Sequence, residues 1–354
     1  MQKVDYLIVG QGIVGTLLAW FLDRAGKSYV LFDNGQQQSA SKVAAGLINP
    51  ITGRRFVKSW MIETLLPFAK QTYQEMEAVV GSPLWKETPI VRYFQTTAEG
   101  NNWLTKTSYD GYEQFLSQEQ LPEHLHHVIH DSGGYGIING ARVDVGLLVQ
   151  YFRQTYIEKK VLVNEAFDYQ QLHCDGDEVH YGDWKAKRVL FCEGHSAIQN
   201  PWFSHLPYES AKGEVLMLRI PNLHTDFILK KTQFLVSIEK DLFWFGSNYE
   251  WEDLTDYPTK EGKAYLEERL KDILQLEYSI VDHIAAVRPI LKDRRPAIGW
   301  HPDYPQLGFL NGMGTKGTSI APYWVHHFVE HLVHGTALSE EVTIARFFEE
   351  PNQA

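Results

Sequence analysis

Three glycines near the start of the chain, Gly10, Gly12 and Gly15, stand in the spacing GxGxxG. The apolar run 6–9 precedes them and residues 16–24 carry an apolar face, so the segment predicts a strand, a tight turn and a helix. Glycines here permit the turn and the close approach of a pyrophosphate, which the free N–H groups at the helix start then bind. The residues expected to bind a dinucleotide are Gly10, Gly12, Ile13, Val14 and Gly15.

An acidic residue, Asp33, ends the second apolar run at 28–32, and Gly26 closes the helix that precedes this run. Asp33 thus completes a strand–turn–helix–strand unit at the position from which a carboxylate accepts hydrogen bonds from a ribose. Its charge repels a 2′-phosphate, so NADP is disfavoured. A glycine turn without a ligand is the alternative, and the strand before the turn, the helix after it and the acidic Asp33 together argue against it.

A stretch of small residues, 39–47, follows the second strand. Small side chains let the backbone pass close to a flat ring and donate N–H groups to it, and Ser41 and Lys42 could also meet the pyrophosphate. A surface loop is the alternative that composition alone favours. The residues of this stretch assigned to the cofactor are Ser41, Lys42, Ala45, Gly46 and Leu47.

A second glycine-rich turn, 311–317, opens the last predicted helix, and Arg288-Pro289 precedes it. A helix N-terminus is an anion site, and in a flavoenzyme its dipole would stabilise negative charge on the reduced ring. A glycine-rich helix start without a ligand is the alternative. The residues assigned to the cofactor here are Gly312, Gly314, Thr315, Lys316, Gly317 and Thr318.

The elements that must hold these residues alternate between helix and strand at both ends of the chain. Helices are expected at 60–80, where Pro67 predicts a kink, and at 144–156, 260–274 and 318–332. Strands are expected at 90–94, 161–163, 169–173, 189–191 and 307–310, with several between 214 and 247. Residues 35–55 read as a long loop, and 95–130 show no clear period. This order predicts an α/β fold with an inserted, mostly antiparallel sheet.

Composition narrows the class of protein further. The 354 residues suggest about two domains, and a net charge of −11 argues against a nucleic-acid partner. Two cysteines, a start without the pattern of a signal peptide and no long apolar run predict a cytoplasmic protein without a membrane span. No metal is expected: His327 and His331 share a helix face but lack further ligands, so a structural role is favoured. The oligomeric state stays open.

The ordered set of motifs resembles the D-amino-acid oxidase family of FAD-dependent oxidoreductases, the group that includes glycine oxidase and sarcosine oxidase, and it looks closest to the glycine oxidases. The motifs beyond those above are Arg142-Val143-Asp144, Cys192-Glu193-Gly194 and Lys212-Gly213-Glu214. The resemblance implies non-covalent FAD, a Rossmann-like FAD-binding domain and a substrate domain inserted into it. The FAD-binding domain would comprise residues 1–84, 141–212 and 286–354, and the substrate domain 85–140 and 213–285.

The resemblance also implies roles for single residues. In the family, the arginine at the place of Arg288 binds the substrate carboxylate, whereas a structural salt bridge is the alternative. Phe234 falls where a substrate-facing tyrosine is common, and Tyr249 at another substrate position; both could instead be core aromatics. Segment 163–167 matches the strand that meets the adenine, and Phe167 in it stands where the family often has valine. Phe167 is therefore assigned to the cofactor, as are Cys192 and Gly194 of the Cys192-Glu193-Gly194 motif.

Several departures from the family leave the substrate open. Phe234 lacks a hydroxyl, Thr315 stands where the family has a second arginine, and no cysteine near Met313 could link the flavin. Arg54 and Arg55 could supply a replacement anion clamp or simply surface charge. The resemblance implies oxidation of the C–N bond of a small amino or imino acid by hydride transfer to flavin N5. The alternatives are a tRNA-modifying flavoprotein, a dehydrogenase with an acceptor other than oxygen, and a flavin-bearing binding protein.

Overall fold

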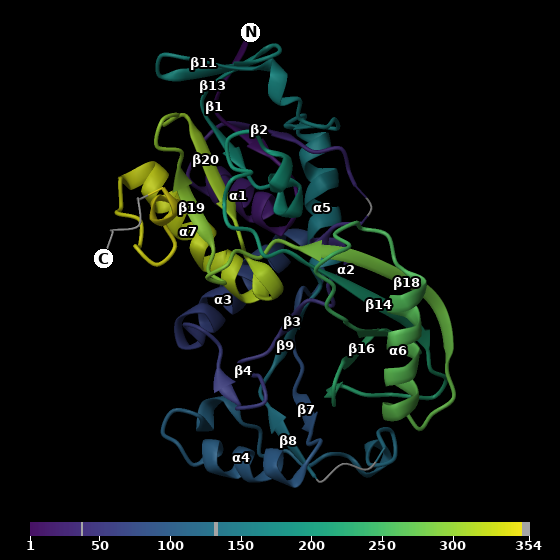
Figure 1. Ribbon diagram of the computed structural model, residues 1–354. Coiled ribbons are helices and arrows are strands. Elements are labelled where there is room, and N and C mark those ends of the chain that lie inside the picture. Colours follow the sequence, from purple (N-terminus) through teal and green to yellow (C-terminus); the bar gives the residue numbers. More distant parts are fainter. Residues whose placement is uncertain (37, 131–133, 349–354) are drawn as a thin grey trace. The chain divides into compact units, whose positions relative to one another are not determined.

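The computed structural model describes residues 1–36, 38–130 and 134–348, and the chain in it divides into two compact units (Figure 1). The first unit comprises Met1–Lys42, Val145–Ala211 and Val287–Ala354. The second comprises Val43–Asp144 and Lys212–Ala286. Both units are therefore assembled from segments that lie far apart in the sequence.

The first unit is built on an eight-stranded sheet whose centre is parallel. Strand β1 pairs in parallel with β2 and with β13, β10 adds outside β2, and β20 adds to β13. The hairpin of β11 and β12 and the strand β19 are antiparallel additions. The strands are β1 (Gln2–Val9), β2 (Tyr29–Phe32), β10 (Leu162–Val163), β11 (Leu172–Asp175), β12 (Glu178–Tyr181), β13 (Trp184–Phe191), β19 (Ala297–Trp300) and β20 (Leu307–Asn311).

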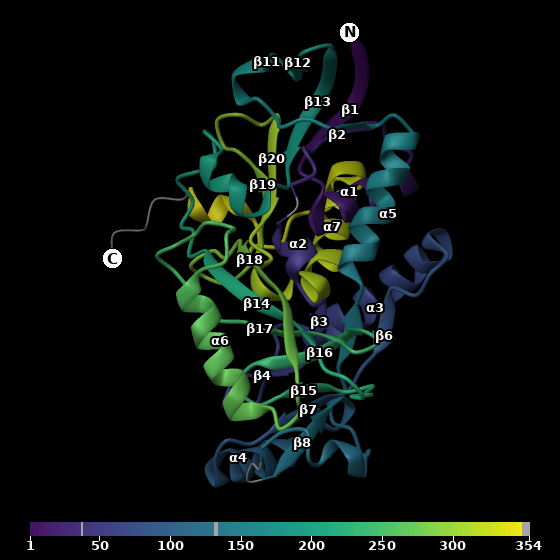
Figure 2. The same cartoon turned by 90° about the vertical axis from the view of Figure 1, so that its right-hand side faces the viewer.

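Helix α1 (Ile13–Arg24) is the inner helix of this unit, because every residue from Ile13 to Leu22 is buried. It packs against α5 (Val145–Glu158) and α7 (Gly317–His334), which lie beside it in Figure 2. Gly26, at φ +66°, donates its N–H to the Asp23 carbonyl and ends the helix as predicted. The short helix α2 (Ala40–Val43) follows β2.

The second unit is built on a seven-stranded sheet in the order β18-β14-β17-β16-β15-β7-β8. The strand β17 pairs antiparallel with β14 and with β16, β16 pairs antiparallel with β15, and β7 pairs antiparallel with β8, whereas β15 and β7 pair in parallel. The strands are β7 (Ile90–Tyr93), β8 (Tyr135–Ile138), β14 (Ala211–Arg219), β15 (Ile228–Lys230), β16 (Phe234–Glu239), β17 (Leu242–Gly246) and β18 (Ser279–Arg288).

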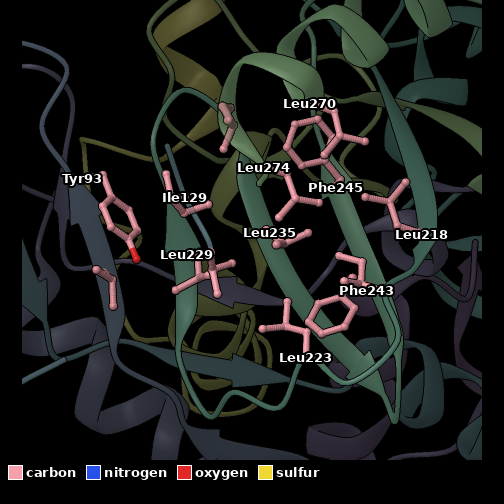
Figure 3. Packing of buried hydrophobic residues seen from close by; sticks show 14 of the residues in the cluster. Tyr93, Ile129, Leu218, Leu223, Leu229, Leu235, Phe243, Phe245, Leu270 and Leu274 are labelled. Atoms are coloured by element: carbon pink, nitrogen blue, oxygen red, sulfur yellow. The ribbon is translucent and has the colours of Figure 1, made fainter. Parts of the chain in front are cut away.

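Helix α6 (Lys260–Ile273) covers one face of this sheet. Its Leu270 and the following Leu274 pack with Leu218, Leu235 and Phe245, as Figure 3 shows. Because side chains alternate between the faces of a strand, the residues between these point to the other face. That second face packs in a separate apolar cluster with Phe56 and Phe94, among others.

Shorter elements complete the second unit. A three-stranded sheet is formed by β3 (Leu47–Ile48), β9 (Ala141–Val143) and β6 (Trp85–Glu87), and a hairpin by β4 (Ile51–Thr52) and β5 (Val57–Lys58). Two further helices are α3 (Ile62–Val80) and α4 (Thr97–Thr107).

Some predicted elements differ from the structure. Residues 169–171 form a 3-10 turn, so the strand expected at 169–173 begins only at Leu172. The loop expected at 35–55 contains α2, β3 and β4, and α3 continues through Pro67. Helix α4 lies in the stretch without a period, and β18 and β19 were not expected.

The division into units also departs from the predicted domain boundaries. Residues 43–84, expected in the FAD-binding domain, lie in the second unit, and so do residues 141–144. In that unit β9 pairs with β6 on one side and with β3 on the other. Residues 349–354, the end of the predicted third segment, are outside the described residues.

Candidate functional site

The first glycine turn admits no side chain at two of its three glycines. A Cβ on Gly10, at φ +95°, would lie 2.6 Å from the carbonyl oxygen of Cys192. A Cβ on Gly15 would lie 1.9 Å from the carbonyl oxygen of Gly10. Both values are far below van der Waals contact, so close packing of α1, β1 and β13 depends on these glycines.

The N-terminus of α1 carries no negative charge of its own. Gly12 is the N-cap and has no side chain to accept the free N–H groups, and the first turn holds no acidic residue. Ser41 Oγ lies there, 3.0 Å from the N–H of Ile13, which donates to it. Lys42 Nζ donates to the carbonyl oxygens of Gly35 and Gln36, and burial lowers its pKa. The helix dipole is therefore available to an anion.

The carboxylate of Asp33 accepts hydrogen bonds from three donors of the protein. It accepts the N–H groups of Gln11 and Gly35, each at 2.8 Å, and Nη1 of Arg153 at 2.6 Å. A carboxylate has about four acceptor positions, so one remains for a ribose hydroxyl. Arg153, on α5, was not predicted, because nothing local in the sequence links it to Asp33.

The second glycine turn joins the other motifs of the first unit. The N–H of Gly314 donates to the Pro289 carbonyl at 3.0 Å, and Asn311 Nδ2 donates to the Gly194 carbonyl at 2.7 Å. A Cβ on Gly317 would lie 3.9 Å from Cγ2 of Ile13. Contacts within one unit thus bring together the first turn, the Cys192–Gly194 segment, the Arg288-Pro289 pair and the second turn.

Four residues of this C-terminal part differ in their surroundings. Arg288 ends β18, is half-buried and donates from Nη1 to the Ala211 carbonyl at 3.3 Å. Thr315 is exposed, whereas Thr318 is buried in the first turn of α7. Burial lowers the pKa of Lys316, and the positive charge of Arg295 lowers it further.

A buried carboxyl group, Glu193, lies between two residues assigned to the cofactor. It accepts hydrogen bonds from Tyr169 Oη at 2.5 Å and from Asn200 Nδ2 at 2.8 Å. Burial raises the pKa of Glu193 to about 7, against the opposing effect of these two donors. Cys192 beside it is buried, which raises the pKa of its thiol well above the usual value.

A family model described as FAD dependent oxidoreductase, DAO, matches residues 5–327 of the chain. The chain belongs to this family. It is thus an FAD-dependent oxidoreductase of two-domain α/β architecture, and FAD is its cofactor.

Solved structures share the fold at low sequence identity. Glycine oxidase from Geobacillus kaustophilus superposes with a TM-score of 0.77 at 18% identity, over 96% of both chains. Iminodiacetate oxidase from Chelativorans sp. BNC1 gives 0.74 at 20%, over 97% of this chain and 98% of that one. L-proline dehydrogenase from P. horikoshii gives 0.74 at 15%, over 95% of both chains.

The residues of the first unit fit FAD. Gly10 and Gly15 have no side chains that would crowd this turn, and Ser41 accepts the Ile13 N–H at the start of α1 while the Gly12 N-cap has no side chain to accept the next ones, so this backbone would suit a pyrophosphate. Phe167, assigned to the adenine end, stacks on Tyr181 with ring centroids 4.2 Å apart, so core packing occupies one face of its ring.

The remaining assigned cofactor residues, Ala45, Gly46 and Leu47, lie in the second unit. Gly46 is at φ +74°, and a Cβ there would lie 1.8 Å from the Val143 carbonyl oxygen. Arg142 Nε donates to the Ala45 carbonyl at 3.2 Å, and Leu47 pairs with Arg142. Two motifs of this FAD-dependent family, separate in the sequence, therefore pack on each other.

The two aromatic residues assigned to the substrate also lie in the second unit, whereas Arg288 lies in the first. Phe234 is half-buried, and Lys230 Nζ stands 3.6 Å from its ring centroid. Tyr249 is 51% exposed and stacks on Trp251 at 5.8 Å, so it is no core aromatic.

The histidines of α7 make hydrogen bonds within the fold. His331 Nε2 lies 2.9 Å from Trp300 Nε1, which donates to it, and His327 Nε2 accepts the N–H of Ser339. Across the described parts of the chain, no group of three His, Cys, Asp or Glu residues could hold a metal ion. No helix among those residues is long and apolar enough to cross a membrane.

Proposed function

We propose that this FAD-dependent oxidoreductase oxidises the C–N bond of a small amino or imino acid. The observation that carries the proposal is the hydrogen bond from Gly314 to Pro289, which fixes Arg288 beside the second glycine turn. An arginine at this place can pair with a carboxylate through two parallel hydrogen bonds. Glycine oxidase, iminodiacetate oxidase and L-proline dehydrogenase are named for such acids, which supports the assignment.

The fold alone does not select this substrate class, because L-alpha-glycerophosphate oxidase from Mycoplasma pneumoniae shares it with a TM-score of 0.71 at 17% identity, over 94% of this chain and 95% of that one. Arg288 is what favours a carboxylate. Residues of the first glycine turn, Asp33 and Ser41 would hold FAD, which supplies a hydride acceptor at N5 when bound.

In this mechanism the chain positions the substrate and stabilises the negative charge that develops during the reaction. Arg288 binds the substrate carboxylate and so fixes the α-carbon relative to the cofactor. The dipole of α7 stabilises negative charge that develops at its N-terminus, since the first turn of α7 has no acidic residue. The substrate reacts as the neutral amine, and the imine product is hydrolysed by water.

The test is anaerobic mixing of the FAD-loaded protein with glycine, sarcosine, proline and both enantiomers of other amino acids. Bleaching of the oxidised flavin bands by one of them supports the proposal and identifies the substrate. Admitting oxygen afterwards distinguishes an oxidase, which forms hydrogen peroxide, from a dehydrogenase. A yellow protein that no member of the panel bleaches contradicts the proposal.

Two variants then test Arg288. Arg288→Ala should raise KM for the carboxylated substrate by about 100-fold, because truncating one partner of a buried charge pair is costly. Lys292→Ala removes an exposed cation nearby and should leave KM unchanged. Equal KM values for both variants would contradict the role of Arg288.

A further inference from the structure

Lys230 lies on the face of the second unit's sheet that α6 does not cover. It pairs with Arg92 of β7 on one side and with Phe234 of β16 on the other. The chain neighbours Leu229 and Leu235 belong to the cluster under α6. Because side chains alternate between the two faces of a strand, Lys230, Arg92 and Phe234 project from the opposite face. All of these residues belong to the second unit.

That face is apolar around the two cations, since Ile90 and Ile228 are buried on it. Arg92 has a counter-ion there: its Nη2 lies 3.1 Å from Glu99 Oε1, and both side chains are about nine-tenths buried. The charges of Arg92 and Glu99 compensate each other. The ammonium of Lys230 is therefore a positive charge in excess on this face.

Two N–H donors on these neighbouring strands have no acceptor. Nε of Arg92 is buried and has no hydrogen-bond partner among the described residues. Nζ of Lys230 stands 3.6 Å from the ring centroid of Phe234, and no residue in the described ranges forms a hydrogen bond or ion pair with it. A cation–π contact satisfies none of the three ammonium donors. Since buried donors in folded proteins are nearly always hydrogen-bonded, these two indicate an acceptor from outside the chain.

The charges at this place act on one another as cations that lack negative partners. Burial lowers the pKa of Lys230 to about 7, Arg92 lowers it further and Glu99 opposes both. Burial also lowers the pKa of the Arg92 guanidinium; Glu99 opposes this shift, and the positive charge of Arg54, in the turn between β4 and β5, adds to it. Arg54 is exposed to water, whereas Lys230 is half-buried. A bound anion would stabilise the charged form of Lys230.

We propose that Lys230, together with Arg92, forms a binding site for a small organic carboxylate. A carboxylate carries one negative charge and so matches the one ammonium in excess, whereas a dianion would leave a negative charge on an apolar face. The ring of Phe234 and the apolar residues around it favour a ligand with an apolar body. The site consists of residues of the second unit, so it goes beyond the proposed function and requires neither Arg288 nor the oxidation of an amino acid.

Butyrate and butyramide are matched probes, because they share an apolar body and differ in charge. Calorimetric titration uses the FAD-loaded full chain with Arg288→Ala, so that the proposed substrate site does not contribute. The Kd of butyrate should be at least about tenfold below that of butyramide. Adding Lys230→Met should raise the butyrate Kd about 10–100-fold, the usual range for a hydrogen bond to a charged group. Lys230→Arg keeps the charge and should retain most of the preference.

Lys231→Met is the control, because it removes an adjacent lysine whose Nζ donates to the His130 carbonyl at 3.2 Å. It should leave the Kd of butyrate unchanged. FAD absorbance of each variant shows whether the fold is intact, and Lys230→Gln replaces Lys230→Met should the latter lose FAD.

Equal Kd values for butyrate and butyramide, or a butyrate Kd that Lys230→Met does not change, would overturn the site. Inorganic phosphate that binds more tightly than butyrate, and in a way that Lys230→Met removes, would overturn the assignment to carboxylates. The titration involves no reduction of the flavin. Its outcome is therefore independent of whether any amino acid bleaches the protein, and failure of the proposed function is seen separately.

Discussion

Arg153 and Asp33, 120 residues apart in the sequence, form an ion pair with Nη1 2.6 Å from Oδ1. The same guanidinium donates to the Asp33 carbonyl and to Asn164 Oδ1. Arg153 therefore holds the carboxylate that we assign to the ribose, and on that assignment we expect Arg153 to act as a positioning residue for FAD.

Removing this positioning should weaken the binding of FAD. Arg153→Met should raise the Kd of FAD about tenfold, and Asp33→Asn should do so by a similar factor, because both disturb the charged acceptor. Fluorescence titration of the apoprotein with FAD measures this. Lys159→Met is the control, because it breaks only the exposed ion pair between Lys159, which follows α5, and Asp23 of α1, and it should not change the Kd. An unchanged Kd for Arg153→Met would show that the pair is only structural.

Gly46 and Gly81 have nearly the same φ and different surroundings. Both are at positive φ, +74° and +72°, but only Gly46 has an atom within 4 Å of a built Cβ. Gly81→Ala should cost about 1 kcal/mol of unfolding free energy through strain alone. Gly46→Ala should cost more, about 3 kcal/mol or above, since the Val143 carbonyl must move. Urea unfolding of the two variants measures the difference, and equal losses would contradict the packing argument.

Glu193 should make stability depend on pH. Its pKa is raised to about 7 in the folded protein, so the folded state binds more protons than the unfolded state between about pH 4.5 and 7. This contribution to the unfolding free energy is full below pH 4.5 and falls as the pH rises through 7. Glu193→Gln should therefore stabilise the protein at pH 8 by about 2–3 kcal/mol and have little effect below pH 5. A stabilisation independent of pH would contradict the assignment.

Lys230 should make stability depend on pH in the opposite direction to Glu193. Its pKa is lowered to about 7, so the unfolded state binds the extra proton between about pH 7 and 10.5. The unfolding free energy therefore falls as the pH drops from 10.5 to 7 and then stays low. Lys230→Met should raise Tm by about 2–4 °C at pH 6 and much less at pH 10, as scanning calorimetry would show. The same Tm shift at both pH values would mean that packing, not charge, is responsible.

The sequence by itself determined the structure of the first 33 residues and the class of cofactor that the protein uses. The GxGxxG turn, helix α1, β2 and Asp33 follow from patterns read within short windows, and the structure has all of them. The family match bears out the FAD-dependent class and the fold. Local patterns suffice here because a strand–turn–helix–strand unit is held together by contacts between near neighbours in the chain.

Tertiary structure alone decided which distant segments meet. Residues 43–84 lie in the second unit, where β3 pairs with β9, and no local pattern in the sequence predicts that pairing. The partner of Asp33 and the pairing of Lys230 with Arg92 likewise depend on how strands and helices far apart in sequence pack together. Hydrophobic periodicity shows that a residue faces a core, but the register between strands decides which residue lies opposite it.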